Sequence, residues 1–203
     1  MGFFKRHMKL NDLITDNLLA AFCVEFKTTL TKVQGDAWRF IAAECDALAI
    51  TDANQFAYIL GTVWNECRFK SIKEIRAKQG TEVWKLQERY WHTGYYGRGY
   101  SQLTWLKNYQ KFSPLVGRDL VKNPDDVLLP AVGAKIIVTG MAFGMFTGKR
   151  LSQYFTPDLH DWMGARSIVN GKLPGQKYGF MAKECADAAQ KIRALLMDFA
   201  PTL

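Results

Sequence analysis

The chain has 203 residues, 48% of them apolar, and a formal net charge of +8. This length fits one domain, or one domain with a helical extension, and the apolar content indicates a globular protein with a substantial core. The positive charge favours polyanionic partners such as nucleic acid, anionic lipid surfaces or an acidic bacterial cell wall, without choosing among them.

Metal-binding and membrane-spanning classes fit this sequence poorly. The four cysteines are far apart and the three histidines show no ligand spacing, so we expect no metal, no other cofactor, and free thiols in a protein made in a reducing cytoplasm. Residues 10–24 carry Asp12 and Asp16 where a secretory signal needs an uninterrupted apolar run. The most apolar stretch, residues 131–146, contains Lys135 and is too short for a membrane span, so it predicts a buried helix.

The first 50 residues indicate two helices. Apolar residues recur at helical spacing over residues 10–30 and again over residues 38–48, after Gly35, and we expect the two helices to pack as a hairpin. They contain no catalytic constellation, so a scaffold role is the default interpretation. A domain boundary near residue 50 is weakly indicated.

Residues 51–66 predict an amphipathic helix with a carboxylate on its apolar face. Asp52, or the threonine before it, can cap the start of this helix. Glu66 lies seven residues after Ile59 and three after Val63, which at about 100° per residue places it on the apolar stripe. Partial burial and the negative end of the helix dipole both favour the protonated carboxyl that a general acid needs. A solvated, fraying helix end is the alternative reading of such a lone glutamate.

Residues 70–90 are charged and irregular and contain Glu74, Glu82 and Glu88. On one straight helix, Glu74 would lie about 12 Å beyond Glu66 along the axis. The chain must therefore turn back after Glu66 if two carboxylates are to flank one bond, and the spacing alone leaves this open. For Glu82 and Glu88, a solvated position among lysines and arginines is the default interpretation.

Residues 95–109 combine tyrosines, a tryptophan, glycines and small polar side chains in a way that suits neither a core segment nor a solvated loop. Aromatic faces can stack on sugar rings, amides and hydroxyls can bond to sugar hydroxyls, and Gly97 and Gly99 allow close approach. Only Arg98 and Lys107 are charged in residues 95–109, so a binding surface formed by this stretch suits a carbohydrate better than a phosphate. A glycine-rich turn leading into an aromatic core helix is the alternative.

The rest of the chain is expected to be mainly helical. In order, we expect a turn or helix start at residues 123–125, a helix over 130–146, a short helical segment over 151–155, a turn at Asn170-Gly171, a loop over 172–177 and a final helix over 178–199.

Several of these residues, taken in this order, resemble glycoside hydrolase family 19, the chitinase family that also includes phage and bacterial peptidoglycan-degrading enzymes. The resemblance covers about residues 50–175, and its specific part is Tyr-Tyr-Gly-Arg-Gly followed by Gln-Leu-Thr-Trp. The residues that carry it are Glu66, Phe69, Ile72-Lys73-Glu74, residues 95–99 and 102–105, Asn108-Tyr109, residues 123–125 and Asn170-Gly171.

The resemblance implies a mainly α, lysozyme-like fold with two helical lobes around a cleft, with room for a small β-hairpin. Residues 1–203 would then form a single catalytic domain, in which residues 1–50 are an N-terminal helical extension or lobe and residues 51–203 are the catalytic core. The implied reaction is hydrolysis of a β-1,4 bond next to an N-acetylated sugar, with inversion.

The resemblance also implies roles for single residues. By position, Glu66 resembles the general acid, Glu74 the general base, and Thr104 the hydroxyl that helps to hold the attacking water. The substrate-binding residues implied in the same way are Tyr96, Arg98, Gln102, Asn108, Lys135 and Asn170.

The chemistry of an inverting enzyme agrees with this assignment. Two carboxyls about 6.5–9.5 Å apart are needed, one protonated and one ionised, and the lysines and arginines around Glu74 favour its ionisation. Two departures from the family pattern stand out. Asn65 replaces the histidine that precedes the acid in many members, and the interval to Glu74 is short and basic, so Glu88 is the reserve candidate for the base.

The leading hypothesis is an endolysin-type hydrolase of peptidoglycan glycan strands, either a phage endolysin or a virion-associated lysin. It would be made in the host cytoplasm without a signal peptide and would act on the periplasmic wall after membrane permeabilisation. Its charge should draw it to the anionic wall surface and make lysis weaken with salt. We expect a monomer with no stable membrane span and no nucleic-acid partner. The alternatives are a chitinase, a lytic transglycosylase, a catalytically inactive wall-binding module and, least favoured, a basic nucleic-acid binder.

Overall fold

The computed structural model describes residues 9–171 and 180–200, and these ranges are mainly α-helical. The α-helices are α1 (Leu10–Leu13), α2 (Asp16–Glu25), α3 (Lys32–Ala47), α4 (Ala53–Cys67), α5 (Glu82–Gln87), α6 (Leu106–Val116), α7 (Pro130–Ala142), α8 (Ser167–Asn170) and α9 (Phe180–Phe199). Short 3-10 helices lie at η1 (Trp91–Thr93), η2 (Pro124–Leu128), η3 (Leu151–Gln153) and η4 (Gly164–Arg166).

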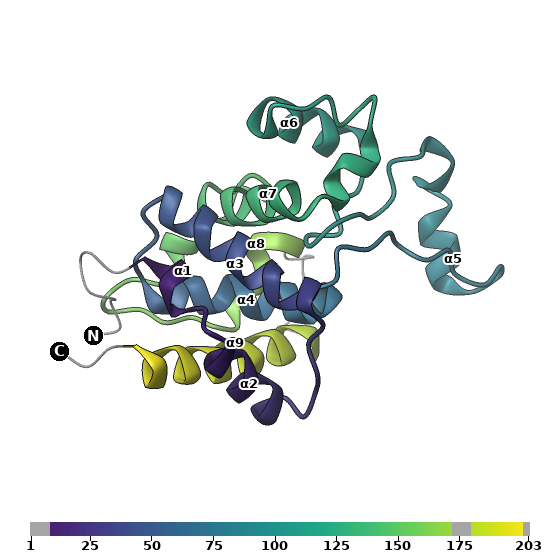
Figure 1. Cartoon of the computed structure of the whole chain (residues 1–203). Helices are drawn as coiled ribbons and strands as arrows, with labels where there is room; N and C mark the ends of the chain where they lie inside the picture. Colours follow the sequence, from purple (N-terminus) through teal and green to yellow (C-terminus); the bar gives the residue numbers. More distant parts are fainter. Residues whose placement is uncertain (1–8, 172–179, 201–203) are drawn as a thin grey trace.

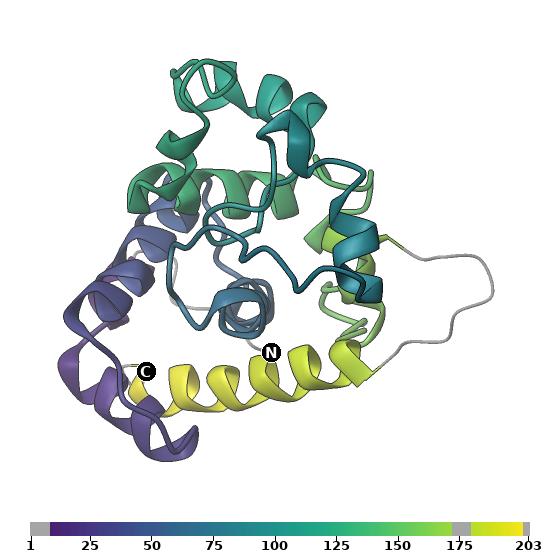
Figure 2. The same cartoon turned by 90° about the vertical axis from the view of Figure 1, so that its right-hand side faces the viewer.

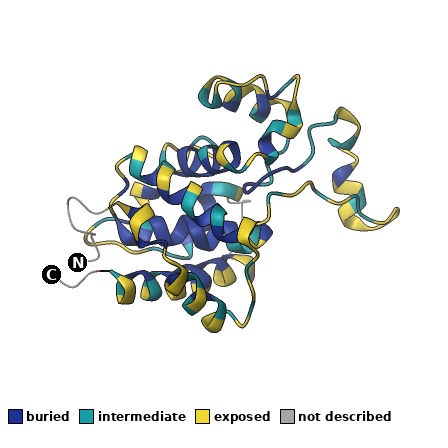
Figure 3. Cartoon of the chain, in the orientation of Figure 1, coloured by how far each residue is buried: buried dark blue, intermediate teal, exposed yellow. Residues whose placement is uncertain are grey.

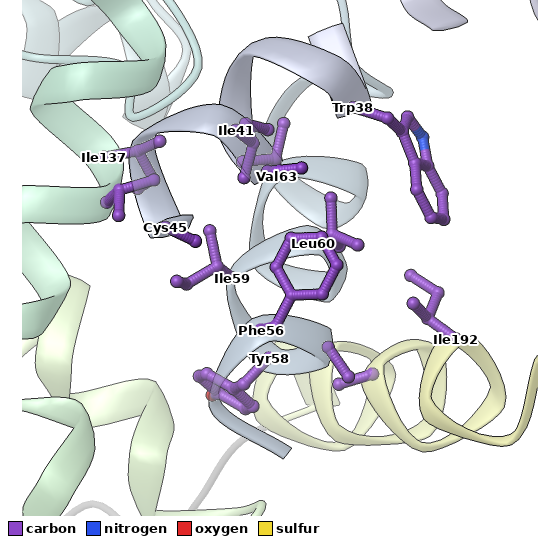
Figure 4. Close-up of a cluster of buried hydrophobic side chains, with 14 of the residues drawn as sticks. Trp38, Ile41, Cys45, Phe56, Tyr58, Ile59, Leu60, Val63, Ile137 and Ile192 are labelled. Atoms are coloured by element: carbon purple, nitrogen blue, oxygen red, sulfur yellow. The ribbon is translucent and has the colours of Figure 1, made fainter. Parts of the chain in front are cut away.

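Helix α4 is the centre of the molecule. Its start is capped as expected, because the Asp52 carboxylate accepts hydrogen bonds from the backbone of Asn54 at 2.7 Å and of Gln55 at 3.0 Å. The helix packs against α9 on one side and against α3 and α7 on others, so it is surrounded by helices (Figures 1 and 2). Nearly all of it is buried, and Figure 4 shows its side chains meeting those of α3, α7 and α9.

Close contact between α4 and α9 depends on a glycine. A Cβ atom on Gly61 would lie 2.7 Å from Cβ of Ala189 and 2.8 Å from its Cα and backbone nitrogen. The two helix backbones therefore approach so closely that only glycine fits at this position of α4.

The expected single helix over residues 10–30 is wrong in detail, because the chain divides into α1 and α2. Thr15 begins α2 by accepting a hydrogen bond from the Leu18 backbone at 3.2 Å, and this cap interrupts the helix. Helix α1 packs on α3, whereas α2 packs chiefly on α9. The ring of Phe22 on α2 still meets Trp38 on α3 with centroids 5.1 Å apart, so the first helices share the main core with α4.

A second, smaller core lies on the far side of α7. It is built from Leu103, Tyr109, Phe112, Leu120, Val127, Val132 and Ile136, which come from the segment before α6, from α6, the loop after it, η2 and the outer face of α7. Helix α7 contributes Ile137, Val138 and Met141 to the main core. The described chain therefore has two hydrophobic cores that meet at α7, which agrees with the two helical lobes expected.

The segment between α4 and η1 projects from the body as an arm (Figure 1), with mainly exposed or half-buried residues (Figure 3). The sequence indicated no regular structure here, but α5 forms within it because Thr81 caps the Trp84 backbone at 3.2 Å. The arm carries exposed apolar side chains, including Ile75 at 82% exposure.

No strand ladder forms in residues 9–171 or 180–200. The small β-hairpin allowed for is reduced to isolated bridges, Lys73 with Arg98 and Phe155 with His160. Within the same ranges no helix is long and apolar enough to cross a membrane, and no three His, Cys, Asp or Glu side chains cluster as metal ligands would. Cys23, Cys45, Cys67 and Cys185 are all free thiols. The loop expected over residues 172–177 and the start of the last helix at residue 178 lie outside the described residues.

Candidate active site

Glu66 occupies the last turn of α4 and faces inward. Its side chain is only 14% exposed, which confirms the position on the apolar face that the helical spacing predicted. The next two residues end the helix in an unusual way, because Arg68 and Phe69 both have left-handed backbone angles, with φ of 54° and 58°. This pair changes the direction of the chain immediately after Glu66.

The partner of Glu66 is Arg166, which comes from η4, one hundred residues later in the chain. Nη2 of Arg166 lies 2.5 Å from Oε1 of Glu66, and its side chain is 9% exposed. Burial is the largest single influence and lowers the pKa of Arg166, but Glu66, Cys185 and Tyr58 together raise it above its usual value, so the guanidinium stays positive. In the part of the chain that is described, neither Nη1 nor Nη2 of Arg166 meets hydrogen-bond geometry, so the contact with Glu66 is an ion pair.

Glu74 is held by neutral donors. Its Oε1 accepts hydrogen bonds from the Tyr90 hydroxyl at 2.7 Å and from Nε2 of Gln87 at 2.9 Å. Its Oε2 accepts one from the backbone nitrogen of Gly97 at 2.9 Å. Burial and the bond to Glu74 raise the pKa of Tyr90 well above its usual value, so this hydroxyl remains a donor at working pH. Three donors fix the Glu74 carboxylate and stabilise its negative charge.

Glu74 is joined to the 95–109 stretch by backbone pairing. The backbone nitrogen of Glu74 donates to the Gly97 carbonyl at 2.8 Å, and that of Gly99 donates to the Ile72 carbonyl at 3.1 Å. A Cβ atom on Gly97 would lie 2.9 Å from Oε1 of Gln102 and 3.2 Å from Oε2 of Glu74. Gly97 therefore allows the Glu74 carboxylate and the Gln102 amide to approach the same piece of backbone.

Arg98 organises this stretch from the inside. It is only 3% exposed, and its Nη1 donates to the carbonyls of Gly94 at 2.9 Å and Tyr96 at 3.1 Å and to the Tyr109 hydroxyl at 3.0 Å. Its Nε donates to Asp125 at 2.8 Å. The described contacts of its guanidinium are all internal, and they hold the backbone of this stretch in place.

Asp125 connects Arg98 to the arm. Lys73 binds the second oxygen of this carboxylate at 2.6 Å, and Lys73 together with Arg98 lowers the pKa of Asp125 below its ordinary value. The ammonium group of Lys73 is therefore paired with Asp125, although Lys73 is next to Glu74 in the sequence.

The aromatic residues of the stretch divide into core and surface. Tyr100 and Tyr109 are 1% and 0% exposed, as the core-helix alternative predicted for the stretch. Tyr96 is half-buried and stacks on Trp91 with ring centroids 4.4 Å apart. Trp105 is 37% exposed, with the strained backbone angle φ of 76°, which is rare for a bulky residue and is typical of functional sites.

Three of the polar residues implied by the resemblance form successive hydrogen bonds from their side chains to backbone carbonyls. Nε2 of Gln102 donates to the carbonyls of Ile72 at 3.2 Å and Gly99 at 3.0 Å. The Thr104 hydroxyl donates to the Gln102 carbonyl at 2.9 Å, and Nδ2 of Asn108 donates to the Thr104 carbonyl at 2.7 Å. Gln102, Thr104 and Asn108 are all half-buried, and each retains acceptor capacity.

Lys135 and Asn170 take no part in these hydrogen bonds. Lys135 is half-buried on α7, between residues of the two cores. Asn170 is exposed and, instead of forming the expected turn with Gly171, is the last residue of α8, which ends at Gly171 with φ of 68°. Glu88, the reserve base, pairs with Arg76 across the arm.

Three contact residues were not identified from the sequence, namely Arg166, Tyr90 and Gln87. The first is an ordinary arginine in a short segment, and the others lie 16 and 13 residues after Glu74 in a charged stretch. No local pattern marks any of them, because each acquires its partner through tertiary packing.

The sequence matches no known protein-family model and no curated protein. Among solved structures, a chitinase C mutant superposes with a TM-score of 0.59 at 18% identity, covering 98% of this chain and 98% of that one. Chitinase C from Streptomyces griseus superposes with a TM-score of 0.51 at 18% identity, covering 96% of this chain and 93% of that one. The likeness extends over both lobes, and it confirms that this chain has the mainly helical, chitinase-like and lysozyme-like fold that the resemblance implied.

Proposed function

We propose that the chain is an endolysin-type glycoside hydrolase that cleaves β-1,4 bonds of peptidoglycan glycan strands by inversion. The observation that carries the proposal is the contrast between two carboxylates. Glu66 is nearly buried against one arginine, whereas Glu74 is held by three neutral donors on the stretch that is rich in sugar-binding side chains. Two acidic groups in unlike surroundings are what an acid and a base acting on one bond require.

Glu66 is assigned as the general acid. Its Oε1 is taken by Arg166, which fixes the carboxyl and leaves Oε2 to carry a proton to the glycosidic oxygen. A general acid must carry its proton when the bond breaks, and we place the uptake of that proton in the complex, where the bound glycan excludes water from this half-buried position.

Glu74 is assigned as the general base. An ionised carboxylate has about four acceptor positions, and three are used by Gln87, Tyr90 and Gly97. The remaining position on Oε2 is available for the attacking water. Thr104 is assigned to hold that water, since its hydroxyl proton points to the Gln102 carbonyl and its lone pairs stay free.

The remaining residues are assigned to substrate binding. Gln102 and Asn108 offer amide oxygens to sugar hydroxyls, and Lys135 and Asn170 are assigned as further polar contacts. Tyr96, whose ring lies between Trp91 and the guanidinium of Arg98, is assigned a contact at the edge of its ring. Arg98 acts indirectly, by holding the backbone of the 95–109 stretch in the conformation that presents these side chains.

Peptidoglycan is favoured over chitin by the net charge of +8, which attracts an anionic wall polymer more than a neutral one. We propose that the protein is a monomer that acts on the wall after a separate membrane lesion, or from a virion. A chitinase is the second candidate, because the solved structures that share the fold are of chitinase C.

One assay separates these functions. Purified peptidoglycan and chitin oligomers are digested side by side, and new reducing ends are identified by mass spectrometry. Faster release from peptidoglycan is expected. Release from chitin alone would favour the chitinase, anhydro ends would identify a lytic transglycosylase, and no release from either would leave a wall-binding module.

A further inference from the structure

A surface pocket beside the proposed active site has a composition that the assignments above do not use. It has a volume of about 540 Å³ and is formed by Arg89, Trp105, Leu106, Lys107 and Gln110. Trp105, which is 37% exposed and has a strained backbone angle, forms part of it.

The pocket is joined to Glu74 by one side chain. The Tyr90 hydroxyl binds Glu74 at 2.7 Å, and the edge of its ring meets Trp105 with centroids 5.0 Å apart. Trp105 also follows directly after Thr104. A glycan placed against Glu74 and Thr104 therefore has this pocket beside it.

The pocket carries positive charge that the protein does not neutralise. Arg89 lies over the Trp105 ring at 5.8 Å, and Lys107 is the second residue of α6. Neither side chain forms an ion pair in the described ranges, although their neighbours on the arm do: Arg76 pairs with Glu88, and Lys85 pairs with Glu82. Glu82 and Glu88 are thus committed to other cations, and Glu74 is held by neutral donors, so the two cations at the pocket remain available.

The start of α6 adds to this positive character. No side chain caps the first turn of α6, so the backbone N–H groups of Leu106 and Lys107 keep their donor capacity at the pocket. Gln110 adds an amide on the same rim. Two cations, an amide and a flat indole together suit a sugar ring that bears a carboxylate.

We propose that this pocket binds a carboxylate carried by the glycan, either on the lactyl ether of the sugar or on a peptide attached to it, with the sugar ring against Trp105. The inference rests on the proposed function and narrows its substrate class to acidic glycans. It explains physically why a hydrolase with a chitinase-like fold would prefer peptidoglycan, since chitin has no group to neutralise Arg89 and Lys107.

The test compares three substrates. Intact peptidoglycan carries peptide carboxylates, glycan strands stripped of peptide by an amidase carry the free lactyl carboxylate, and chitin oligomers carry neither. kcat/KM is measured on each for the wild type, for Arg89→Gln/Lys107→Gln and for the control Lys122→Gln/Lys149→Gln. The control removes the same charge from exposed positions that do not form the pocket.

We expect the pocket variant to lower the ratio of kcat/KM on acidic glycan to that on chitin oligomers by about tenfold, mainly through KM, because the contact is equally strong in the ground and transition states. The control variant should keep the wild-type ratio. A fall on intact peptidoglycan alone identifies the peptide carboxylates, and a fall on stripped strands identifies the lactyl group.

The two ways of failing are distinct. If wild-type protein cleaves acidic glycan but the pocket and control variants give the same ratio on both acidic substrates, the carboxylate pocket is overturned and the proposed function stands. If the wild type cleaves no acidic glycan, the proposed function itself is wrong.

Discussion

Arg166 holds Glu66 at 2.5 Å in a setting where both side chains are largely buried. The contact ties the end of α4 to η4, so the position of the proposed acid depends on a segment distant in sequence. The Glu66 carboxylate is thus both the proposed acid and one half of a buried ion pair. Its removal should therefore lower the catalytic rate and, separately, the stability of the fold.

We predict that Glu66→Gln removes catalysis while the protein still folds. General acid catalysis contributes about 10²–10⁴-fold to rate, so release of reducing ends should fall by at least about a hundredfold. The variant also leaves Arg166 without its counter-charge, which costs about 1–3 kcal/mol. Thermal unfolding by circular dichroism should therefore show a folded protein with a lowered Tm.

The matched control for that variant is Glu82→Gln, because Glu82 is 85% exposed and pairs only with Lys85. It should keep both rate and Tm. Full activity in Glu66→Gln would remove Glu66 from the mechanism.

The identity of the base can be decided by comparing Glu74→Gln with Glu88→Gln. Glu74→Gln should lose most of the rate and keep wall binding, because the amide cannot accept a proton from water. It should also lower the Tm slightly, since an NH₂ group would face one of three donors. Glu88→Gln breaks only the pair with Arg76 on the arm and should stay active. Loss of activity in Glu88→Gln with retention in Glu74→Gln would reverse the assignment.

Arg98 is predicted to be a structural centre of the 95–109 stretch. Arg98→Lys keeps the charge but loses the planar fork that reaches Asp125, two carbonyls and the Tyr109 hydroxyl. We expect a loss of about 2–3 kcal/mol in the free energy of unfolding, together with a lower rate. Arg118→Lys alters the exposed pair with Asp126 and should cost less than about 1 kcal/mol. Equal unfolding midpoints for the two variants in urea would contradict this role.

The contact between α4 and α9 gives a prediction about packing. Gly61→Ala places a methyl group 2.7 Å from Cβ of Ala189, so the helices must separate, at a cost of about 1–3 kcal/mol. For a domain of this size the Tm should fall by about 3–10 °C. Gly35→Ala meets the ends of two flexible side chains, Leu19 at 3.1 Å and Arg39 at 3.9 Å, and should leave the Tm nearly unchanged. A Tm for Gly61→Ala equal to that of the wild type would show that α4 and α9 are not in such close contact.

Local patterns predicted much of this architecture. The helical spacing of α4 placed Glu66 on the buried face correctly, because a period of 3.6 residues is fixed by backbone geometry alone. The same reasoning missed the break between α1 and α2 and the short helix α5. In both places a threonine cap, at Thr15 and at Thr81, was the signal that could have revealed the boundary.

The candidate site was less predictable from sequence. The resemblance identified Glu66, Glu74 and the 95–109 stretch, but the settings of the two carboxylates depend on Arg166 and Tyr90, which arrive through tertiary contacts. The basic neighbourhood expected to ionise Glu74 is also different in the structure. Lys73 turns to Asp125 and Arg76 to Glu88, and neutral donors hold the carboxylate instead.

The most direct test of the two-carboxylate account is the anomeric form of the new reducing end, followed by NMR during the first minutes of peptidoglycan digestion. Water activated by Glu74 on the face opposite Glu66 must release the α-anomer first. Initial appearance of the β-anomer, or of anhydro ends in place of a reducing sugar, would contradict the account.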